Sequence, residues 1–335
     1  MRPTEREWET AVALLQAADE VVLACHVSPD GDALGSMLGL GAALRAAGKK
    51  VRASWGGTPF EVPTSYSFLP ALDLLVPPEQ VPAAPALIVT FDTGSVDRLG
   101  TLADRVSSAG RALVLDHHPS NTRYGTDHLV DETLAATAVI VADLLDRLGW
   151  PLTAEVAGPL YTGLVTDTGS FRYAATTPAV HALAARLLAT GIRHDLISRA
   201  IWDSQPFGYV QLLGAVSARA VLEVDAVGGA GLVWTTVTAD DLAASGLGLA
   251  DVEGVIDVLR TAREAEVAVV LKQEPDGGAW RVSTRSKGGI DVGAVCVGLG
   301  GGGHRFAAGF TTYDEPLVVL DQLRTALARA PRLQA

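Results

Sequence analysis

The fold is decided by the sequence between Glu20 and Asp32, which reads EVVLACHVSPDGD. Its first part is a continuous apolar run of strand length that ends at His26. A Pro-Asp-Gly loop follows, and residues 33–50 then have the composition of a helix with a stop at Gly48. A strand that is apolar on both faces is typical of a parallel sheet covered on two sides.

Three further runs repeat this pattern in the first half of the chain. They are Val51–Trp55, Ala86–Asp92 and Arg111–Asp116. Helical sequence separates them, and it continues over residues 134–167, with a break at Gly149, and over residues 177–220. The pattern predicts an α/β fold whose N-terminal domain is a parallel sheet between helices.

The last third of the chain has a different pattern of predicted strands and helices. Strand-like runs at Glu266–Glu274 and Ala279–Lys287 flank a Pro-Asp-Gly-Gly turn, which predicts a hairpin. We also expect a strand at Gly231–Val237, a helix at Asp251–Ala262, and a glycine-rich stretch before a short strand and a closing helix. This is the pattern of a smaller α/β domain. The predicted boundaries are 1–190 for the first domain, 191–220 for a helical connector and 221–335 for the second domain.

Composition limits the classes of protein that fit. The chain has 335 residues, 48% of them hydrophobic, so it can bury a large core and is not intrinsically disordered. No apolar run reaches the 18 or so residues that span a membrane, and two cysteines are too few for a disulfide scaffold. These features predict a cytoplasmic protein without a membrane partner. A net charge of −12 argues against binding long nucleic acid.

Histidines and aspartates gather where the predicted strands end. In a parallel sheet the carboxyl ends of the strands share one edge, which is where ligands bind. A single aspartate at such a position is more often a helix cap or a turn residue. Here three strand ends carry His or Asp together, which predicts a metal site. The candidate residues are His26, Asp30, Asp32, Asp92, Asp116, His117, His118 and Asp167.

The donor types narrow the choice of metal. Several buried carboxylates repel one another unless cations balance them. A mixed imidazole and carboxylate set suits Mn, Fe, Co or Zn, and no cysteine lies in the cluster. Two such ions about 3.5–4 Å apart can activate water for in-line attack on phosphorus. We expect two Mn²⁺ ions per site, with Co²⁺ or Mg²⁺ as substitutes.

Four motifs resemble those of the DHH phosphoesterases. They are HVSPDGDALG at 26–35, FDTG at 91–94, DHH at 116–118 and TDTGSF at 166–171. The sequence GGGH at 301–304, followed by AAG at 307–309, resembles the substrate-binding motif of DHHA1 domains. The two-domain length is most similar to the subgroup of nano-RNA hydrolases and pAp phosphatases. The resemblance implies that the active site lies in the cleft between the two domains.

The resemblance also implies a role for each matching residue. One metal ion would be held by His26, Asp30 and Asp92, and the second by Asp32, Asp92, His117 and Asp167, so that Asp92 bridges the two ions. His118 would act on the scissile phosphate as a catalytic residue, and Asp116 would orient an imidazole.

Further residues are candidates for substrate contact. In the second domain these are Arg285, Gly301, Gly302, Gly303 and His304, because guanidinium and exposed backbone N–H groups suit phosphate. Asn121, in the DHHPSN sequence of the first domain, is as typical of a loop former as of a substrate contact.

The function implied is manganese-dependent hydrolysis of short RNA and dinucleotides such as pApA, and of 3′-phosphoadenosine 5′-phosphate (pAp). Relatives suggest a homodimer. The sequence does not rank pAp against pApA, and a phosphodiesterase specific for cyclic di-AMP or pApA stays open. Less favoured alternatives are a RecJ-like exonuclease, a class II pyrophosphatase and a non-catalytic nucleotide sensor.

Overall fold

The computed structural model describes residues 2–333, and contacts divide the chain into two units, one ending at Ser204 and the other beginning at Gln205. The expected connector at 191–220 contains helices α7 (His194–Trp202) and α8 (Phe207–Ala218), and the division falls between them. No helix among the described residues is long and apolar enough to cross a membrane.

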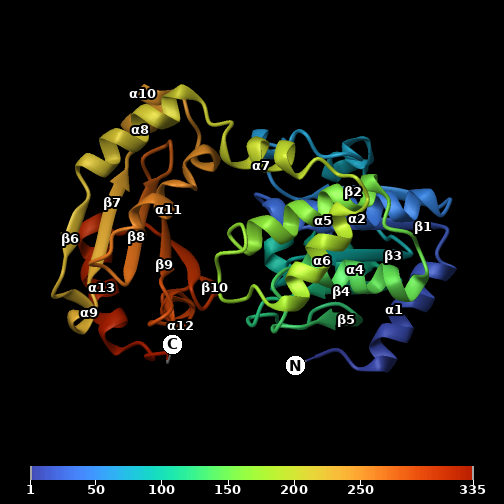
Figure 1. Ribbon diagram of the computed structural model, residues 1–335. Helices are drawn as coiled ribbons and strands as arrows, with labels where there is room; N and C mark the ends of the chain where they lie inside the picture. Colours follow the sequence, from blue (N-terminus) through green and yellow to red (C-terminus); the bar gives the residue numbers. More distant parts are fainter. Residues whose placement is uncertain (1, 334–335) are drawn as a thin grey trace. The chain divides into compact units, whose positions relative to one another are not determined.

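Unit 1 is built on a parallel sheet with the strand order β2-β1-β3-β4-β5 (Figure 1). Its strands are β1 (Glu20–Cys25), β2 (Lys50–Trp55), β3 (Leu87–Phe91), β4 (Arg111–Asp116) and β5 (Asp127–Val130). The chain leaves β1 toward β2 and then returns to the other side of β1 as β3. This reversal between β1 and β3 is the topological switch point, where open α/β sheets bind ligands.

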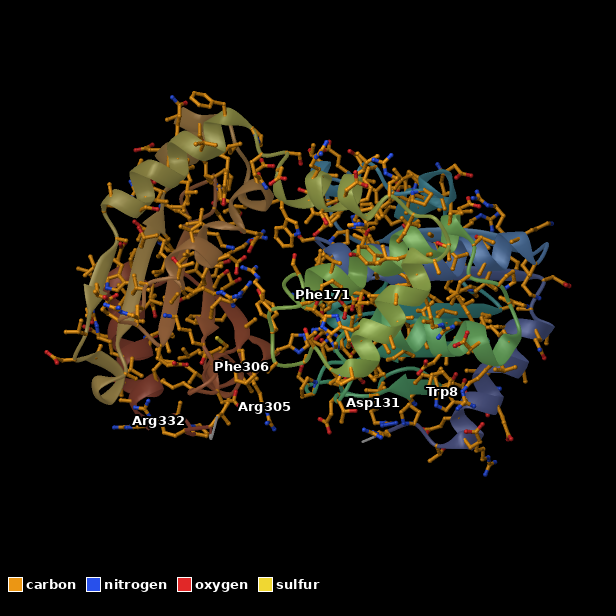
Figure 2. All side chains as sticks on the ribbon, viewed as in Figure 1. Trp8, Asp131, Phe171, Arg305, Phe306 and Arg332 are labelled. Atoms are coloured by element: carbon orange, nitrogen blue, oxygen red, sulfur yellow. The ribbon has the colours of Figure 1, made fainter. Side chains whose placement is uncertain are left out.

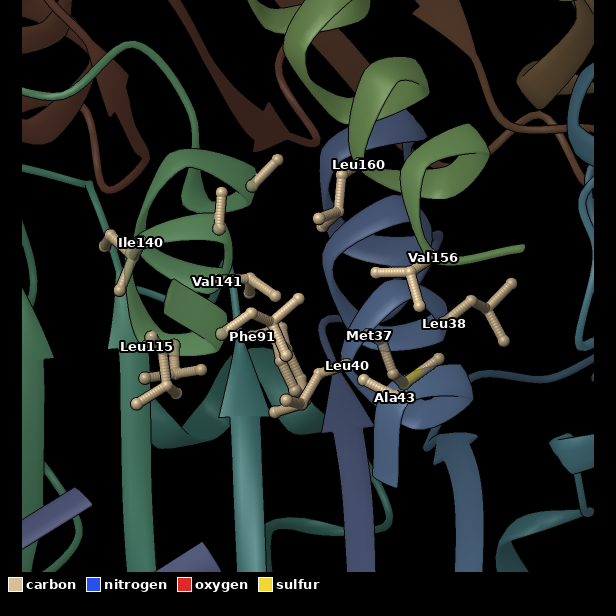
Figure 3. Packing of buried hydrophobic residues seen from close by; sticks show 14 of the residues in the cluster. Met37, Leu38, Leu40, Ala43, Phe91, Leu115, Ile140, Val141, Val156 and Leu160 are labelled. Carbon is tan, nitrogen blue, oxygen red and sulfur yellow. The ribbon is translucent and has the colours of Figure 1, made fainter. Parts of the chain in front are cut away.

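Helices cover both faces of this sheet. The helices that contact its strands are α1 (Glu5–Ala17), α2 (Gly31–Ala46), α3 (Ala103–Ser108) and α4 (Thr137–Leu148). A further layer is formed by α5 (Ala154–Asp167), which packs on α2 and α4, and by α6 (Pro178–Leu188) and α7, which pack on α5. Figure 3 shows Phe91 of β3 and Leu115 of β4 directed toward Leu40 of α2 and Val141 of α4. Trp8, labelled in Figure 2, anchors α1 in the same core. The expected layered α/β architecture is confirmed.

Unit 2 holds a mixed sheet with the order β10-β11-β9-β8-β7-β6. The strands are β6 (Val221–Glu223), β7 (Leu232–Val237), β8 (Val267–Gln273), β9 (Trp280–Ser286), β10 (Gly302–His304) and β11 (Ala307–Thr312). The helices besides α8 are α9 (Ala226–Gly229), α10 (Ala239–Ser245), α11 (Val255–Leu259), α12 (Val292–Gly298) and α13 (Pro316–Arg329). The expected hairpin is present, because β8 and β9 pair antiparallel.

One local expectation in unit 2 is wrong. The single helix expected at Asp251–Ala262 is a 3₁₀ turn at Leu249–Val252 followed by α11. Gly254 separates them, and glycine is a poor helix former. The end of the glycine-rich stretch is itself a strand, since Gly302–His304 pairs with β11 at the edge of the sheet.

Candidate metal centre

His26 and Asp92 directly follow β1 and β3, the two strands that flank the switch point. Cys25 of β1 lies opposite Phe91 of β3, so the residues that follow them emerge side by side. The His26 Nε2 atom lies 3.6 Å from Asp92 Oδ2 and 3.7 Å from Asp30 Oδ2. These three side chains form the first donor cluster.

Asp30 reaches this cluster because it caps helix α2. Its Oδ1 atom accepts hydrogen bonds from the backbone N–H groups of Asp32, at 3.1 Å, and Ala33, at 3.0 Å. This is the usual task of an N-cap aspartate. The cap fixes the carboxylate so that the second oxygen, Oδ2, faces His26.

The second donor cluster gathers around His117, which follows β4. Its Nε2 atom lies 3.0 Å from Asp167 Oδ2, 3.4 Å from Asp92 Oδ1 and 3.8 Å from Asp32 Oδ2. Asp167 is the last residue of α5, and Asp32 lies in the first turn of α2. Asp92 therefore presents one oxygen to each cluster.

The imidazoles of both clusters are oriented by backbone carbonyls. His26 Nδ1 lies 2.8 Å from the carbonyl oxygen of Val27, and His117 Nδ1 lies 3.2 Å from that of Leu134. A ring nitrogen that donates to a carbonyl leaves the opposite nitrogen as the lone-pair donor. In both residues that opposite atom, Nε2, faces the carboxylates.

Burial makes this group of charges costly without cations. His26, Asp32, Asp92 and His117 are all at most 5% exposed. Burial raises the pKa of Asp32 well above its usual value, and the negative charges of Asp92 and Asp167 raise it further. Burial likewise raises the pKa of Asp167 to about 6.

The pKa of the His26 imidazole is also raised, but by the neighbouring carboxylates and not by burial. Burial alone would lower the pKa of His26, but the carboxylates of Asp30 and Asp92 raise it to about 10. Protons on the imidazoles thus balance the buried carboxylates. Divalent cations would supply the same balance, and imidazole with carboxylate is a donor set that suits Mn²⁺. The residues present therefore fit a pair of metal ions.

His118 and Asp116 form a hydrogen-bonded pair beside the two clusters. His118 Nδ1 lies 2.8 Å from Asp116 Oδ1, and the imidazole is partly exposed while the carboxylate is fully buried. Asp116 thus orients the neighbouring imidazole of His118. The other carboxylate oxygen, Oδ2, accepts from Asn121 Nδ2 at 2.6 Å.

The side-chain amide of Asn121 is hydrogen-bonded to its own loop, to Asp116 of β4 and to Thr93, which follows β3. Besides Asp116, its Nδ2 atom reaches the carbonyl of Thr93 at 3.3 Å, and its Oδ1 atom accepts from the backbone N–H of Arg123 at 2.7 Å. These contacts give Asn121 a structural task.

The candidate residues of unit 2 lie together on its sheet. His304 of β10 lies opposite Ala307 of β11, which lies opposite Arg285 of β9. Residues directly opposite in antiparallel strands share a face. His304 and Arg285 therefore lie on one face of the sheet, on either side of Ala307.

The three glycines before His304 differ in what surrounds them. A Cβ atom at Gly301 would lie 2.1 Å from the carbonyl oxygen of Gly309, and one at Gly303 would lie 2.6 Å from that of Ala307. Both positions therefore need glycine for strand pairing. A Cβ at Gly302 would meet nothing within 4 Å, so only this glycine leaves open space.

Sequence reasoning missed two side chains at this centre, Ser36 and Thr137. Both are fully buried and donate hydrogen bonds to candidate metal ligands. Ser36 lies four residues after Asp32 on the same helix, a spacing that places the two side chains on one face. Thr137 has no such signal, because it lies 105 residues from Asp32 and 45 from Asp92 along the chain.

Comparison with known proteins agrees with this arrangement. Residues 20–164 match the DHH family, N-terminal domain, and residues 242–333 match the DHHA1 domain. The chain is 36% identical over 337 residues to the bifunctional oligoribonuclease and PAP phosphatase NrnA of Thermus thermophilus, covering 98% of both chains. The protein of the same name from Bacillus subtilis is 28% identical over 312 residues, with 92% and 94% of the two chains covered.

A solved structure shows the same fold. The exopolyphosphatase-related protein from Bacteroides fragilis superposes with a TM-score of 0.86 at 23% identity, over 97% of this chain and 96% of the other. Because a relative that is 36% identical matches almost end to end, the chain belongs to the DHH phosphoesterase family, in its form with a DHHA1 domain, and is a hydrolase.

Proposed function

We propose that this hydrolase is a manganese-dependent phosphoesterase that cleaves very short RNA, such as pApA, to mononucleotides and converts pAp to AMP and phosphate. The observation that carries the proposal is the shared carboxylate of Asp92, which presents Oδ2 to His26 and Oδ1 to His117. The relatives named as oligoribonucleases and PAP phosphatases support this choice of substrates.

Each of the two donor clusters would hold one metal ion. His26, Asp30 and Asp92 would hold one ion, and Asp32, Asp92, His117 and Asp167 the other. Bound divalent cations neutralise phosphate charge and lower the pKa of water, which is the chemistry that phosphoester hydrolysis needs.

His118 would serve the reacting phosphate directly. Its Nδ1 atom lies 2.8 Å from Asp116 Oδ1, and we propose that the opposite nitrogen, Nε2, contacts the substrate. We assign this atom a hydrogen bond to the scissile phosphate or to the oxygen that leaves. In pAp, water adds to the 3′ phosphorus, the bond from phosphorus to the 3′ oxygen breaks, and that oxygen takes up a proton.

Unit 2 would bind the part of the substrate that does not react. Arg285 and His304 offer a guanidinium and an imidazole on one face of the sheet, and a Cβ atom at Gly302 would meet nothing within 4 Å. A guanidinium fork suits a terminal phosphate. We expect Arg285→Ala to raise KM for 5′-phosphorylated substrates more than it lowers kcat.

One substrate panel tests the proposed function. The purified chain with Mn²⁺ is given pAp, pApA, cyclic di-AMP, pyrophosphate and a 24-nucleotide RNA strand in parallel. We expect AMP from pAp and pApA, with the long strand and pyrophosphate nearly untouched. Faster cleavage of the long strand, pyrophosphate or the cyclic dinucleotide, or binding of pAp without turnover, would overturn the proposal.

The same preparation tests two finer parts of the proposal. Replacing Mn²⁺ by Mg²⁺ should give lower activity, because Mg²⁺ prefers oxygen ligands over imidazole, whereas Co²⁺ should substitute for Mn²⁺. We also propose a homodimer, so light scattering should report twice the chain mass of 34.8 kDa. The mass of a single chain would refute the dimer.

A further inference from the structure

The first turn of α4 has an unusual cap. Its N-cap residue, Ala136, has no side chain that could accept the N–H groups at the start of the helix. The backbone N–H groups of Thr137 and Ala138 instead donate to Asp32, at 2.6 Å to Oδ2 and 3.0 Å to Oδ1. A carboxylate from α2 thus caps α4, where the helix dipole favours negative charge.

The side chain of Thr137 extends this arrangement to a second carboxylate. Its hydroxyl donates to Asp92 Oδ1 at 3.1 Å. Thr137 therefore holds Asp32 through its backbone and Asp92 through its side chain. All three residues are at most 4% exposed, so no bulk water replaces these bonds.

The hydroxyl contacts the oxygen whose direction matters most. Asp92 Oδ1 is the oxygen that faces His117, while Oδ2 faces His26. Rotation of this carboxylate would turn both oxygens away from their clusters. A hydrogen bond to Oδ1 opposes that rotation, and a fixed donor in a dry site is stronger than one in water.

We propose that Thr137 is a positioning residue that sets the affinity of the centre for both of its metal ions. The inference rests on the proposed two-ion centre and extends it beyond the ligands. Loss of such an outer partner lowers metal affinity by about 10–100-fold in other sites. We expect a loss in this range at both ions, because Asp92 is shared.

Ser36 offers an internal comparison. Its hydroxyl donates to Asp32 Oδ1 at 3.1 Å, and Asp32 belongs only to the His117 cluster. Ser36→Ala should therefore weaken one binding event and spare the other. If Thr137→Val weakens both binding events and Ser36→Ala weakens one, the effect comes from the shared carboxylate of Asp92 and not from a general disruption of the site.

The test is calorimetric titration of the full chain with Mn²⁺ alone, without substrate. Thr137→Val keeps the shape and the backbone N–H but removes the hydroxyl, and Thr137→Ser restores it. Thr162→Val is the matched control, since Thr162 is equally buried and its hydroxyl donates to the backbone carbonyl of Gly158 rather than to a carboxylate. Melting curves without metal first establish that each variant folds.

The expected result is weaker binding of both ions in Thr137→Val, near-normal binding in Thr137→Ser, and no change in Thr162→Val. Affinity in Thr137→Val equal to that of the control would overturn the inference. So would a loss that serine does not restore. Absence of Mn²⁺ binding in the unmodified chain would instead refute the proposed two-ion centre.

Discussion

Asp92 combines a strained backbone with a shared side chain. It follows β3 with a φ of +53°, in the left-handed region that aspartate and asparagine enter more readily than most residues. This conformation directs the carboxylate between His26 and His117. Strain of this kind persists only where the surroundings impose it, and it is common at functional sites.

We expect Asp92→Asn to abolish binding of both ions. Asparagine tolerates the same backbone conformation and has nearly the same volume, so the fold should remain. It removes the charge and leaves one carbonyl oxygen for two ions. Mn²⁺ content after dialysis, measured by mass spectrometry, checks this, with Asp97→Asn as an exposed control nearby. Two ions retained by Asp92→Asn would rule out a shared carboxylate.

His118→Ala should separate metal binding from turnover. The imidazole bonds Asp116 and is proposed to contact substrate, while the two ions would be held by other residues. We expect near-normal Mn²⁺ affinity and a loss in kcat within the 10²–10⁴-fold range typical of a positioned acid or base. Rate assays on pAp alongside calorimetry decide this. Loss of metal would make His118 a ligand instead.

At the scale of elements, the site depends on the close packing of α2 against α5. A Cβ atom at Gly35 would lie 2.3 Å from the carbonyl oxygen of Pro159, and one at Gly163 would lie 2.6 Å from Asp32 Oδ1. Glycines thus let the two helix backbones approach. This approach brings Asp32 on α2 near Asp167 at the end of α5.

Gly35→Ala should therefore destabilise unit 1, since the methyl group meets backbone that cannot move aside. Overpacking of this kind costs about 1–3 kcal/mol. Gly158→Ala in α5 is the control, because a Cβ there meets nothing within 4 Å and alanine favours the helix by about 0.5–1 kcal/mol. Thermal melts without metal should move in opposite directions for the two variants. A neutral Gly35→Ala would mean that the helices separate at little cost.

The elements show what the sequence could and could not predict. Strands β1, β3 and β4 are apolar on both faces, and each is followed by or ends in His or Asp, so both the sheet and the candidate ligands were predictable. Strand β5 was missed because it is short and begins with the polar Asp127 and His128. The role of Thr137 was not predictable, since its partners come from α2 and from the end of β3.

At the scale of the whole molecule, the chain consists of two units with separate cores. In unit 1 the central core joins α2, α4 and α5 to the parallel sheet, and in unit 2 two cores lie on opposite faces of the mixed sheet. All six predicted metal ligands belong to unit 1, whereas Arg285 and His304 belong to unit 2. The proposed function thus assigns metal binding and the reacting phosphate to unit 1, and the part of the substrate that does not react to unit 2.

A chain that ends at Ser204 tests this division. It retains the whole core of unit 1 and every predicted ligand, so it should melt cooperatively and bind two Mn²⁺ ions with affinities within a few-fold of the full chain. It lacks Arg285 and His304, so hydrolysis of pAp and pApA should fall to near background. Calorimetry and AMP release, measured on the same preparation, check both halves of the prediction. Full activity in the fragment would mean that substrate is held by unit 1 alone, because the metal centre would then suffice for both binding and cleavage.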